Sequence, residues 1–303
     1  MAERALPADA TGAASPAART RPGIRARLGS APLVVPGILW LALFFLVPLA
    51  IIFVVSLGTK DRFGGVLLDH PTLAHYGAAL SPTFWPTILN SLKYAALTTV
   101  FSIGIGYPVA YWISRYGGRN KTLLLVLVML PFWTSYLIRT YAWMIILRDN
   151  GVVNSVLQAT GVTSEPLILL NTDLSVVLGM TYGFLPFAIL PLFVSIDRLD
   201  DSLVAAARDL YATGRGAFLH VTLPLTMPGV IAAAILTFIP AIGDYVTPDL
   251  LGGAQTTTIA KVIQNLFLGA RDWPSGAALG FLLMLLTIVG TLATLRILRR
   301  EVL

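Results

Sequence analysis

The run LVVPGILWLALFFLVPLAIIFVVSL, residues 33–57, decides the class of this chain. It contains no charged side chain. It is also longer than the roughly 20 residues that an α-helix needs to cross a hydrocarbon core of about 30 Å. The apolar region of a cleaved signal peptide is shorter, about 7–15 residues. The run therefore predicts a membrane-spanning helix that is retained in the mature protein.

Five further apolar runs are long enough to span a membrane, and they cover approximately 87–113, 122–147, 174–196, 225–248 and 275–298. The whole chain is 56% hydrophobic and 12% charged, about half the charged share of a soluble domain. Several runs contain proline or glycine, which membrane helices tolerate when neighbouring helices satisfy the freed carbonyls. We therefore predict an all-α integral membrane protein with six transmembrane helices in residues 31–303.

The basic residues predict the orientation. Residues 1–30 are rich in Ala, Pro and Arg without apolar periodicity, and we expect a disordered tail. Most Lys and Arg outside the apolar runs lie in this tail, in 114–121, in 197–224 and after 295. Because basic loops stay in the cytoplasm, both termini are predicted to be cytoplasmic.

The same rule explains the net charge of +6 without a nucleic-acid partner. The chain has no cysteine, and its three histidines have no metal-ligand spacing.

The longest polar segment on the predicted cytoplasmic side is DRLDDSLVAAARDLYATGRGAFLHVTLP, residues 197–224. Residues 200–202 offer candidates for a helix N-cap. Leu203, Ala207 and Leu210 then recur at helical spacing, and the glycines that follow indicate a turn. We predict two short helices at an angle on the membrane surface. The pattern alone fits equally well an ordinary interfacial helix that covers the bundle.

The exact residues add a resemblance. Ala205-Ala206-Ala207, three residues, Tyr211, nine residues and Val221-Thr222-Leu223-Pro224 follow one another in this loop. This resembles the signature of binding-protein-dependent importer permeases: Glu-Ala-Ala, three residues, Gly, nine residues, Ile-x-Leu-Pro. Ala205 replaces the signature Glu, which with Ser202 as N-cap would complete a capping box, so a weaker helix start is expected. Tyr211 replaces the signature Gly, where the family often keeps a close backbone approach.

The resemblance implies the type I architecture of ATP-binding-cassette importer permeases, in which this loop is a coupling-helix pair seated in a groove of the ATPase subunit. The residues assigned to that contact are Leu203, Ala205, Ala206, Ala207, Arg208, Asp209, Leu210, Tyr211, Gly214, Leu223 and Pro224. The chain has no G-x-x-x-x-G-K-[ST] phosphate loop. We therefore expect no enzyme activity and no cofactor on this chain, with ATP and Mg²⁺ on a partner ATPase dimer. A second, distinct permease subunit and an extracytoplasmic solute-binding protein are the other implied partners, and a permease homodimer is the alternative.

Two more stretches resemble the spermidine/putrescine-type branch of the family: PFWTSYLIRTYAW, residues 131–143, and GDYVTPDLLGG, residues 243–253. This resemblance covers nearly the whole chain beyond residue 30. It implies a multi-pass protein of the bacterial inner membrane and a polyamine substrate. The branch also includes permeases for other small solutes, so an opine or amino-acid-like solute stays open.

Three charged residues lie inside the apolar runs: Lys93, Arg139 and Asp244. With straight helices that rise about 1.5 Å per residue, all three fall at a similar outer level of the membrane. A charge there is costly unless it is paired or wetted. One interpretation is that Asp244 pairs with Arg139 or Lys93 and locks an outer gate. The other is that Asp244 meets an incoming ammonium group together with Tyr245, Trp133 and Tyr141, by charge and cation–π contact.

Three rival classes predict features that the sequence lacks or does not need. An ion-coupled secondary transporter should carry coupling charges near the bilayer midplane, but the charges here are few and are expected in the outer third. A membrane-embedded enzyme should carry a His/Glu zinc pair, a G-x-S-x-G motif or paired aspartates within the spanning runs, and none is present. A channel needs no coupling loop.

Overall fold

The computed structural model describes residues 31–302, with side chains described for 35–292 and for Arg296. The predicted tail, residues 1–30, lies outside the described residues. The chain forms two compact units, one that ends at Ile51 and one that starts at Ile52. Each unit is described separately below.

The described residues of the first unit, 31–51, belong to one long apolar helix that ends at Ser56. This helix consists of α2 (Ala31–Leu41), a π-helical turn (Ala42–Leu46) and α3 (Val47–Ser56). Its large apolar side chains are exposed; Trp40, for example, is 64% exposed. A helix that exposes apolar side chains all round is suited to lipid. This is the first predicted span, which the structure places at Val35–Ser56.

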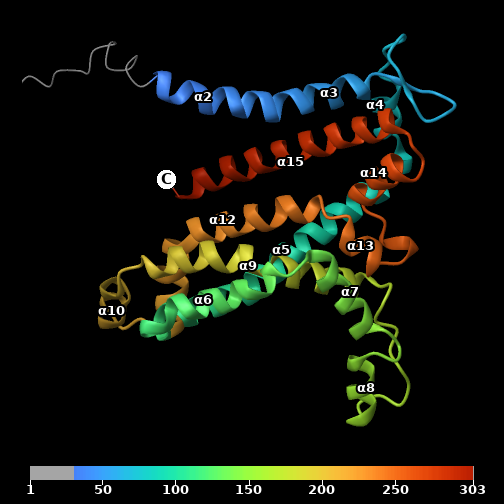
Figure 1. Ribbon diagram of the computed structural model, residues 1–303. Coiled ribbons are helices and arrows are strands. Elements are labelled where there is room, and N and C mark those ends of the chain that lie inside the picture. The colour runs from blue at the N-terminus through green and yellow to red at the C-terminus, as the bar shows by residue number, and fades with distance from the viewer. Residues whose placement is uncertain (1–30, 303) are drawn as a thin grey trace, which may run out of the picture. The chain divides into compact units, whose positions relative to one another are not determined.

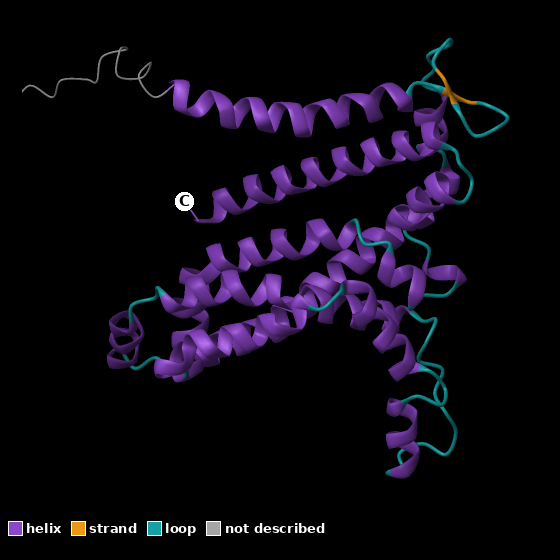
Figure 2. Ribbon diagram, in the orientation of Figure 1, coloured by secondary structure: helices purple, strands orange, loops and turns teal. Residues whose placement is uncertain are grey.

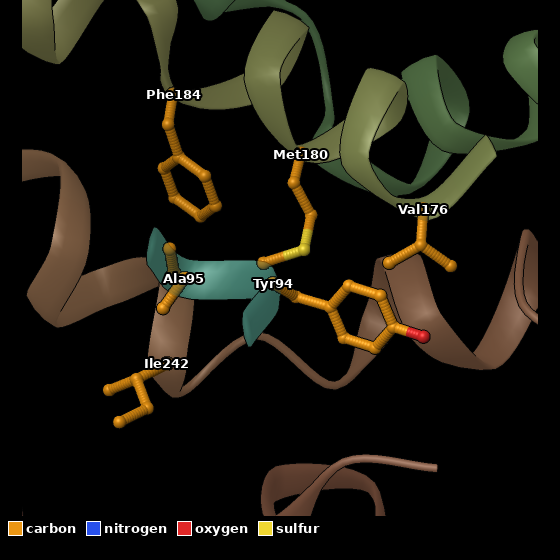
Figure 3. Packing of buried hydrophobic residues seen from close by; sticks show 7 residues of the cluster. Tyr94, Ala95, Val176, Met180, Phe184 and Ile242 are labelled. Atoms are coloured by element: carbon orange, nitrogen blue, oxygen red, sulfur yellow. The ribbon is translucent and has the colours of Figure 1, made fainter. Parts of the chain in front are cut away.

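Three helices form the centre of the second unit, and they pack against one another along their length: α5 (Trp85–Tyr116), α9 (Asp173–Asp197) and α12 (Leu223–Ile242). Tyr94, Met180 and Ile242 belong to a buried cluster that contains residues of all three helices (Figure 3). A second buried cluster, which includes Ala110, Leu192 and Ala233, continues the packing of α5, α9 and α12 toward the end of α5 and α9 and the start of α12.

The remaining elements of the second unit are mostly short. The only strands among the described residues are two strands of two residues each, which pair with one another (Figure 2). The helices are α4 (Ala74–Ala79), α6 (Lys121–Met129), α7 (Tyr136–Leu147), α8 (Val152–Ala159), α10 (Asp201–Asp209), α11 (Gly214–Ala217), α13 (Val246–Leu250), α14 (Ile259–Leu268) and α15 (Trp273–Val302). The antiparallel strands are β1 (Thr59–Lys60) and β2 (Val66–Leu67). Short 3₁₀ turns cover Pro82–Phe84, Gly118–Asn120, Leu130–Trp133 and Ala254–Thr256, and a π-helical turn covers Phe218–Thr222.

The third predicted span, 122–147, is broken. The segment Gly118–Trp133 and the segment Tyr136–Ile146 meet at an angle of 85°. Between them, Thr134 has an extended backbone and Ser135 is also non-helical, shortly after Pro131. The expectation of a straight helix through Arg139 was therefore wrong. Five other helices have spanning length among the described residues, so the six-span prediction is confirmed when the bent pair counts as one span.

The loop 197–224 also differs in part from the prediction. Two short helices are present, α10 and α11, as expected. However, α11 does not end before the next span, because a π-helical turn joins it to α12 and the helix runs without interruption from Gly214 to Ile242. Only α10 is a separate helix. It lies at the opposite end of the second unit from α13 and α14, at the end toward which α15 runs (Figure 1).

Candidate functional site

The start of α10 is capped by Asp200, whose side chain accepts a hydrogen bond of 2.9 Å from the backbone N–H of Ser202. Because the cap is Asp200, the third helical residue is Leu203. Position 205 therefore lies outside any capping box, and the expectation that Ala205 weakens the helix start was wrong. The Ser202 N–H holds the pKa of the Asp200 carboxyl below its usual value. The folded pKa is lowered, so this contribution to stability is present above the unfolded pKa and is lost as the pH falls through the folded value.

The end of α10 forms a Schellman motif around Tyr211. The N–H of Tyr211 donates to the carbonyl of Arg208, and the N–H of Ala212 donates to the carbonyl of Ala207. Tyr211 has a φ of 63°, in the left-handed region. Glycine adopts this region freely, whereas a residue with a Cβ pays about 1–2 kcal/mol. The signature glycine thus corresponds to a backbone requirement that this chain meets with a tyrosine.

Ion pairs fix α10 to the bundle. The guanidinium of Arg115, at the end of α5, pairs with Asp201 in the first turn of α10. Lys121 at the start of α6 pairs with Asp197, the last residue of α9, over 2.6 Å, and Ser114 donates to the same carboxylate over 3.1 Å. Helix α10 begins at Asp201, four residues after Asp197, so its start is attached to α5, α6 and α9.

The predicted contact residues of α10 are largely exposed. Leu203 is 46% exposed, Leu210 is 82% exposed and Tyr211 is 96% exposed. Ala207 is half-buried, as is Val204, which the sequence pattern had not singled out. Among the other predicted residues of the loop, Leu223 is half-buried and the following are exposed: Ala205, Ala206, Arg208, Asp209, Gly214 and Pro224. Leu203 also lines a cleft of about 760 Å³ that residues of α9 and α12 share. We call this exposed set, Leu203, Ala206, Leu210 and Tyr211, the coupling patch.

A second group of predicted residues surrounds Asp244, which lies in the break between α12 and α13. Asp244 is only 7% exposed. Its Oδ1 accepts hydrogen bonds from the backbone N–H groups of Val246 and Thr247, over 2.9 and 3.3 Å. Its Oδ2 accepts from the hydroxyl of Tyr136 in α7 over 2.5 Å. The carboxylate is thus held by neutral donors.

Asp244 lies on the wall of a cavity of about 430 Å³. Its aromatic lining consists of Phe132, Tyr136, Phe184, Phe187 and Tyr245. Arg139 also lines this cavity, and its guanidinium carbon lies 5.6 Å from the ring centre of Phe132 and 5.4 Å from that of Tyr136. Its Nε is buried and has no hydrogen-bond partner among the described residues. The cavity therefore combines one carboxylate, several aromatic faces and one cation that is stacked on rings.

Lys93 does not belong to this group. Its ammonium group pairs with Asp173, the first residue of α9, over 2.7 Å, and the Tyr94 hydroxyl donates to the other oxygen of that carboxylate. The proposed pairing of Lys93 with Asp244 was therefore wrong. The ion pairs found in the described part of the chain include neither Asp244 nor Arg139, so the alternative pairing is not formed either.

Two of the predicted aromatic residues lie away from the cavity wall: Trp133, 74% exposed, and Tyr141, 48% exposed. The aromatic residue that binds Asp244, Tyr136, had not been singled out. It stands within the quoted stretch 131–143, three residues before Arg139, so one helical turn separates the two. That spacing could have identified it. Over the described residues, no group of three or more His, Cys, Asp or Glu side chains is placed to hold a metal ion.

Comparisons with known proteins identify the family and the fold of the chain. The spermidine/putrescine transport system permease protein PotB of Haemophilus influenzae is 41% identical over 240 residues, which cover 79% of this chain and 83% of that protein. PotB of Escherichia coli is 39% identical over 239 residues, which cover 79% and 86%. The inner membrane ABC transporter permease protein YdcU of Escherichia coli is 36% identical over 208 residues, which cover 64% and 66%.

Two solved structures share the fold. A chain of a bacterial ABC transporter involved in the import of the polysaccharide alginate has a TM-score of 0.73 at 18% identity, over 91% of this chain and 97% of that one. A chain of the inward-facing MetNI methionine ABC transporter has a TM-score of 0.53 at 19% identity, over 74% and 99%. The predicted importer-permease fold is confirmed. Residues 26–302 match the model of the binding-protein-dependent transport system inner membrane component, and the chain belongs to that family of importer permeases.

Proposed function

We propose that this chain is the permease subunit of an importer for polyamines, and that Asp244 contacts an ammonium group of the solute on its way through the membrane. The observation that carries the proposal is the cavity beside Asp244, where a buried carboxylate meets several aromatic faces. The PotB relatives, whose name gives spermidine and putrescine, support the same solute class.

The hydrogen bonds of Asp244 favour the interpretation that Asp244 contacts the solute, and they argue against the interpretation that it locks an outer gate. A carboxylate offers about four lone-pair sites, and the three donors at Asp244 leave about one of them free. These donors are neutral, so none of them cancels the negative charge. A primary ammonium group brings both charge and donors, and aromatic faces attract it further by cation–π contact. The PotB relatives and this chemistry together favour a linear diamine or triamine over a sugar or an anion.

The test compares Asp244→Asn with Asp249→Asn in the reconstituted complex. Asp249 is a matched control because it also lies in this segment, but it pairs with Lys261 over 3.2 Å and does not line the cavity. We expect Asp244→Asn to lower putrescine uptake at least tenfold and to leave the ATPase rate without binding protein unchanged. Asp249→Asn should have little effect on uptake. A raised ATPase rate without binding protein, with diamine uptake intact, would instead support the gate lock.

We propose the following partners: an ATPase dimer that carries ATP and Mg²⁺, a second and distinct permease subunit, and an extracytoplasmic solute-binding protein. The relatives and the absence of a phosphate loop support the ATPase partner. We place α10 and both termini in the cytoplasm, as the distribution of Lys and Arg predicts. Co-purification followed by the intact mass of the complex tests the composition. Two copies of this chain in one complex would replace the heterodimer with a homodimer.

An importer of the same architecture could instead carry another small solute, because the name of the relative YdcU specifies no solute. The ligand that co-purifies with the binding protein decides between the two. A polyamine supports the proposal, whereas an anion, a sugar or an amino acid would overturn the solute class and leave the importer role in place.

A further inference from the structure

Asp244 and Arg139 bring opposite charges to one cavity, yet they do not pair with each other. Among the described residues that line this cavity, they are the only two with a charged side chain. No ion pair or side-chain hydrogen bond joins Arg139 to any described residue, and its Nε is buried. Asp244 accepts hydrogen bonds only from neutral donors. Opposite charges that stay unpaired are costly inside a membrane, so the surrounding structure must hold these two apart.

A single tyrosine links the two charges. The ring centre of Tyr136 lies 5.4 Å from the guanidinium carbon of Arg139, and its hydroxyl donates to Asp244 over 2.5 Å. The charges are therefore no farther apart than one tyrosine side chain and its two contacts can span. Arginine carries its guanidinium on a long stem with several rotatable bonds. Without a restraint, the guanidinium could reach the lone pair of Asp244 that the neutral donors leave free.

The restraint is a set of aromatic rings that are themselves fixed. The guanidinium carbon of Arg139 lies 5.6 Å from the ring centre of Phe132. The ring of Phe132 meets that of Phe187 in α9 edge to face, with centres 5.1 Å apart and planes at 87°. Tyr136 is fixed as well, because its hydroxyl oxygen lies 2.6 Å from that of Thr247. Cation–π contacts with two fixed rings hold Arg139 in its present position.

We infer that Phe132 is a positioning residue that keeps Arg139 away from Asp244 and thereby keeps the solute site open. The inference rests on the proposed function, since it takes Asp244 as the solute contact. Arg139 is then an internal competitor of the solute. Once released from Phe132, its guanidinium pairs with Asp244 and fills the place that an ammonium group of the solute needs. The two cations compete because each brings a positive charge and N–H donors to the same carboxylate.

The test measures putrescine uptake by the reconstituted complex, with solute-loaded binding protein in excess. Phe132→Ala should lower uptake about tenfold, which corresponds to the loss of about 1.4 kcal/mol of cation–π attraction. Phe132→Tyr keeps an aromatic face and should retain most of the uptake. The decisive variant combines Phe132→Ala with Arg139→Gln. It removes the competitor together with its restraint, so it should restore most of the lost uptake.

The matched control combines Phe132→Ala with Arg148→Gln. Arg148 directly follows the last residue of α7 but lines a different cavity, so this double variant should be as slow as Phe132→Ala alone. Restoration by Arg139→Gln and not by Arg148→Gln supports the inference.

Three results would overturn the inference and leave the proposed function in place. One is wild-type uptake in Phe132→Ala. Another is a double variant with Arg139→Gln that stays as slow as Phe132→Ala, because the ring would then act through packing alone. The third is equal restoration by Arg148→Gln, which would indicate a general effect of charge. If Asp244→Asn leaves uptake intact, the proposed function fails and this inference fails with it.

Discussion

Helix α9 and helix α12 approach each other so closely at Gly229 that a single methyl group should force them apart. A Cβ atom at Gly229 would lie 2.3 Å from the Cβ of Ser195, 2.8 Å from its Oγ and 2.9 Å from the carbonyl oxygen of Pro191. Small residues at such crossings let membrane helices pack backbone against backbone. We therefore predict that Gly229→Ala destabilises the second unit.

The expected magnitude follows from these distances. Carbon atoms make contact at about 3.5–4.0 Å, so the two helices must separate by about 1.2–1.7 Å. A gap of about 1 Å already forfeits up to half of the dispersion energy of each contact. Overpacking costs about 1–3 kcal/mol, and the upper end applies because a Cβ and a backbone carbonyl cannot rotate away. We expect a loss of about 3 kcal/mol, or roughly 100-fold in the folding equilibrium.

The assay is reversible unfolding of the purified chain in mixed micelles, with the free energy extrapolated to zero denaturant. The control is Gly104→Ala in α5, where an added Cβ meets no atom within 4 Å. That variant should be neutral or more stable, by about 0.5–1 kcal/mol, because alanine favours a helix over glycine. If the two variants unfold with the same free energy, the close approach at Gly229 does not determine the packing.

Two further predictions concern the loops. Ala207→Glu should abolish solute-stimulated ATPase activity by disrupting the half-buried centre of α10, while the chain still inserts and co-purifies with the second permease; unchanged stimulated activity in vesicles would argue against the coupling role. Asn154→Ala should destabilise the segment between α7 and α9 by about 2 kcal/mol, because the fully buried Asn154 amide binds the Arg148 carbonyl and both backbone groups of Leu167. Limited proteolysis should then cleave this segment faster, and wild-type resistance would contradict the reasoning.

The sequence alone was sufficient for the membrane class, for the number of spans and for the position of the helix α10 within the loop 197–224. Hydropathy is a local property, because a predominantly apolar run of about 20 residues favours lipid whatever its neighbours are. The loop signature is local as well: its residues lie within 197–224, and α10 begins and ends inside that segment. The cost of Tyr211 could also be foreseen in part, since the signature glycine marks a backbone requirement.

Tertiary structure alone decided the partners of the charged residues. Asp244 binds Tyr136 and Lys93 binds Asp173, and the two residues of each pair lie far apart in the sequence. Which side chains meet depends on the rotation of each helix and on the bend of 85° between the segments that contain α6 and α7. A rise of 1.5 Å per residue measures position only along an unbroken axis. The cavity beside Asp244 exists because a broken helix and a helix end meet there, and neither break has a fixed angle until the surrounding helices pack against it.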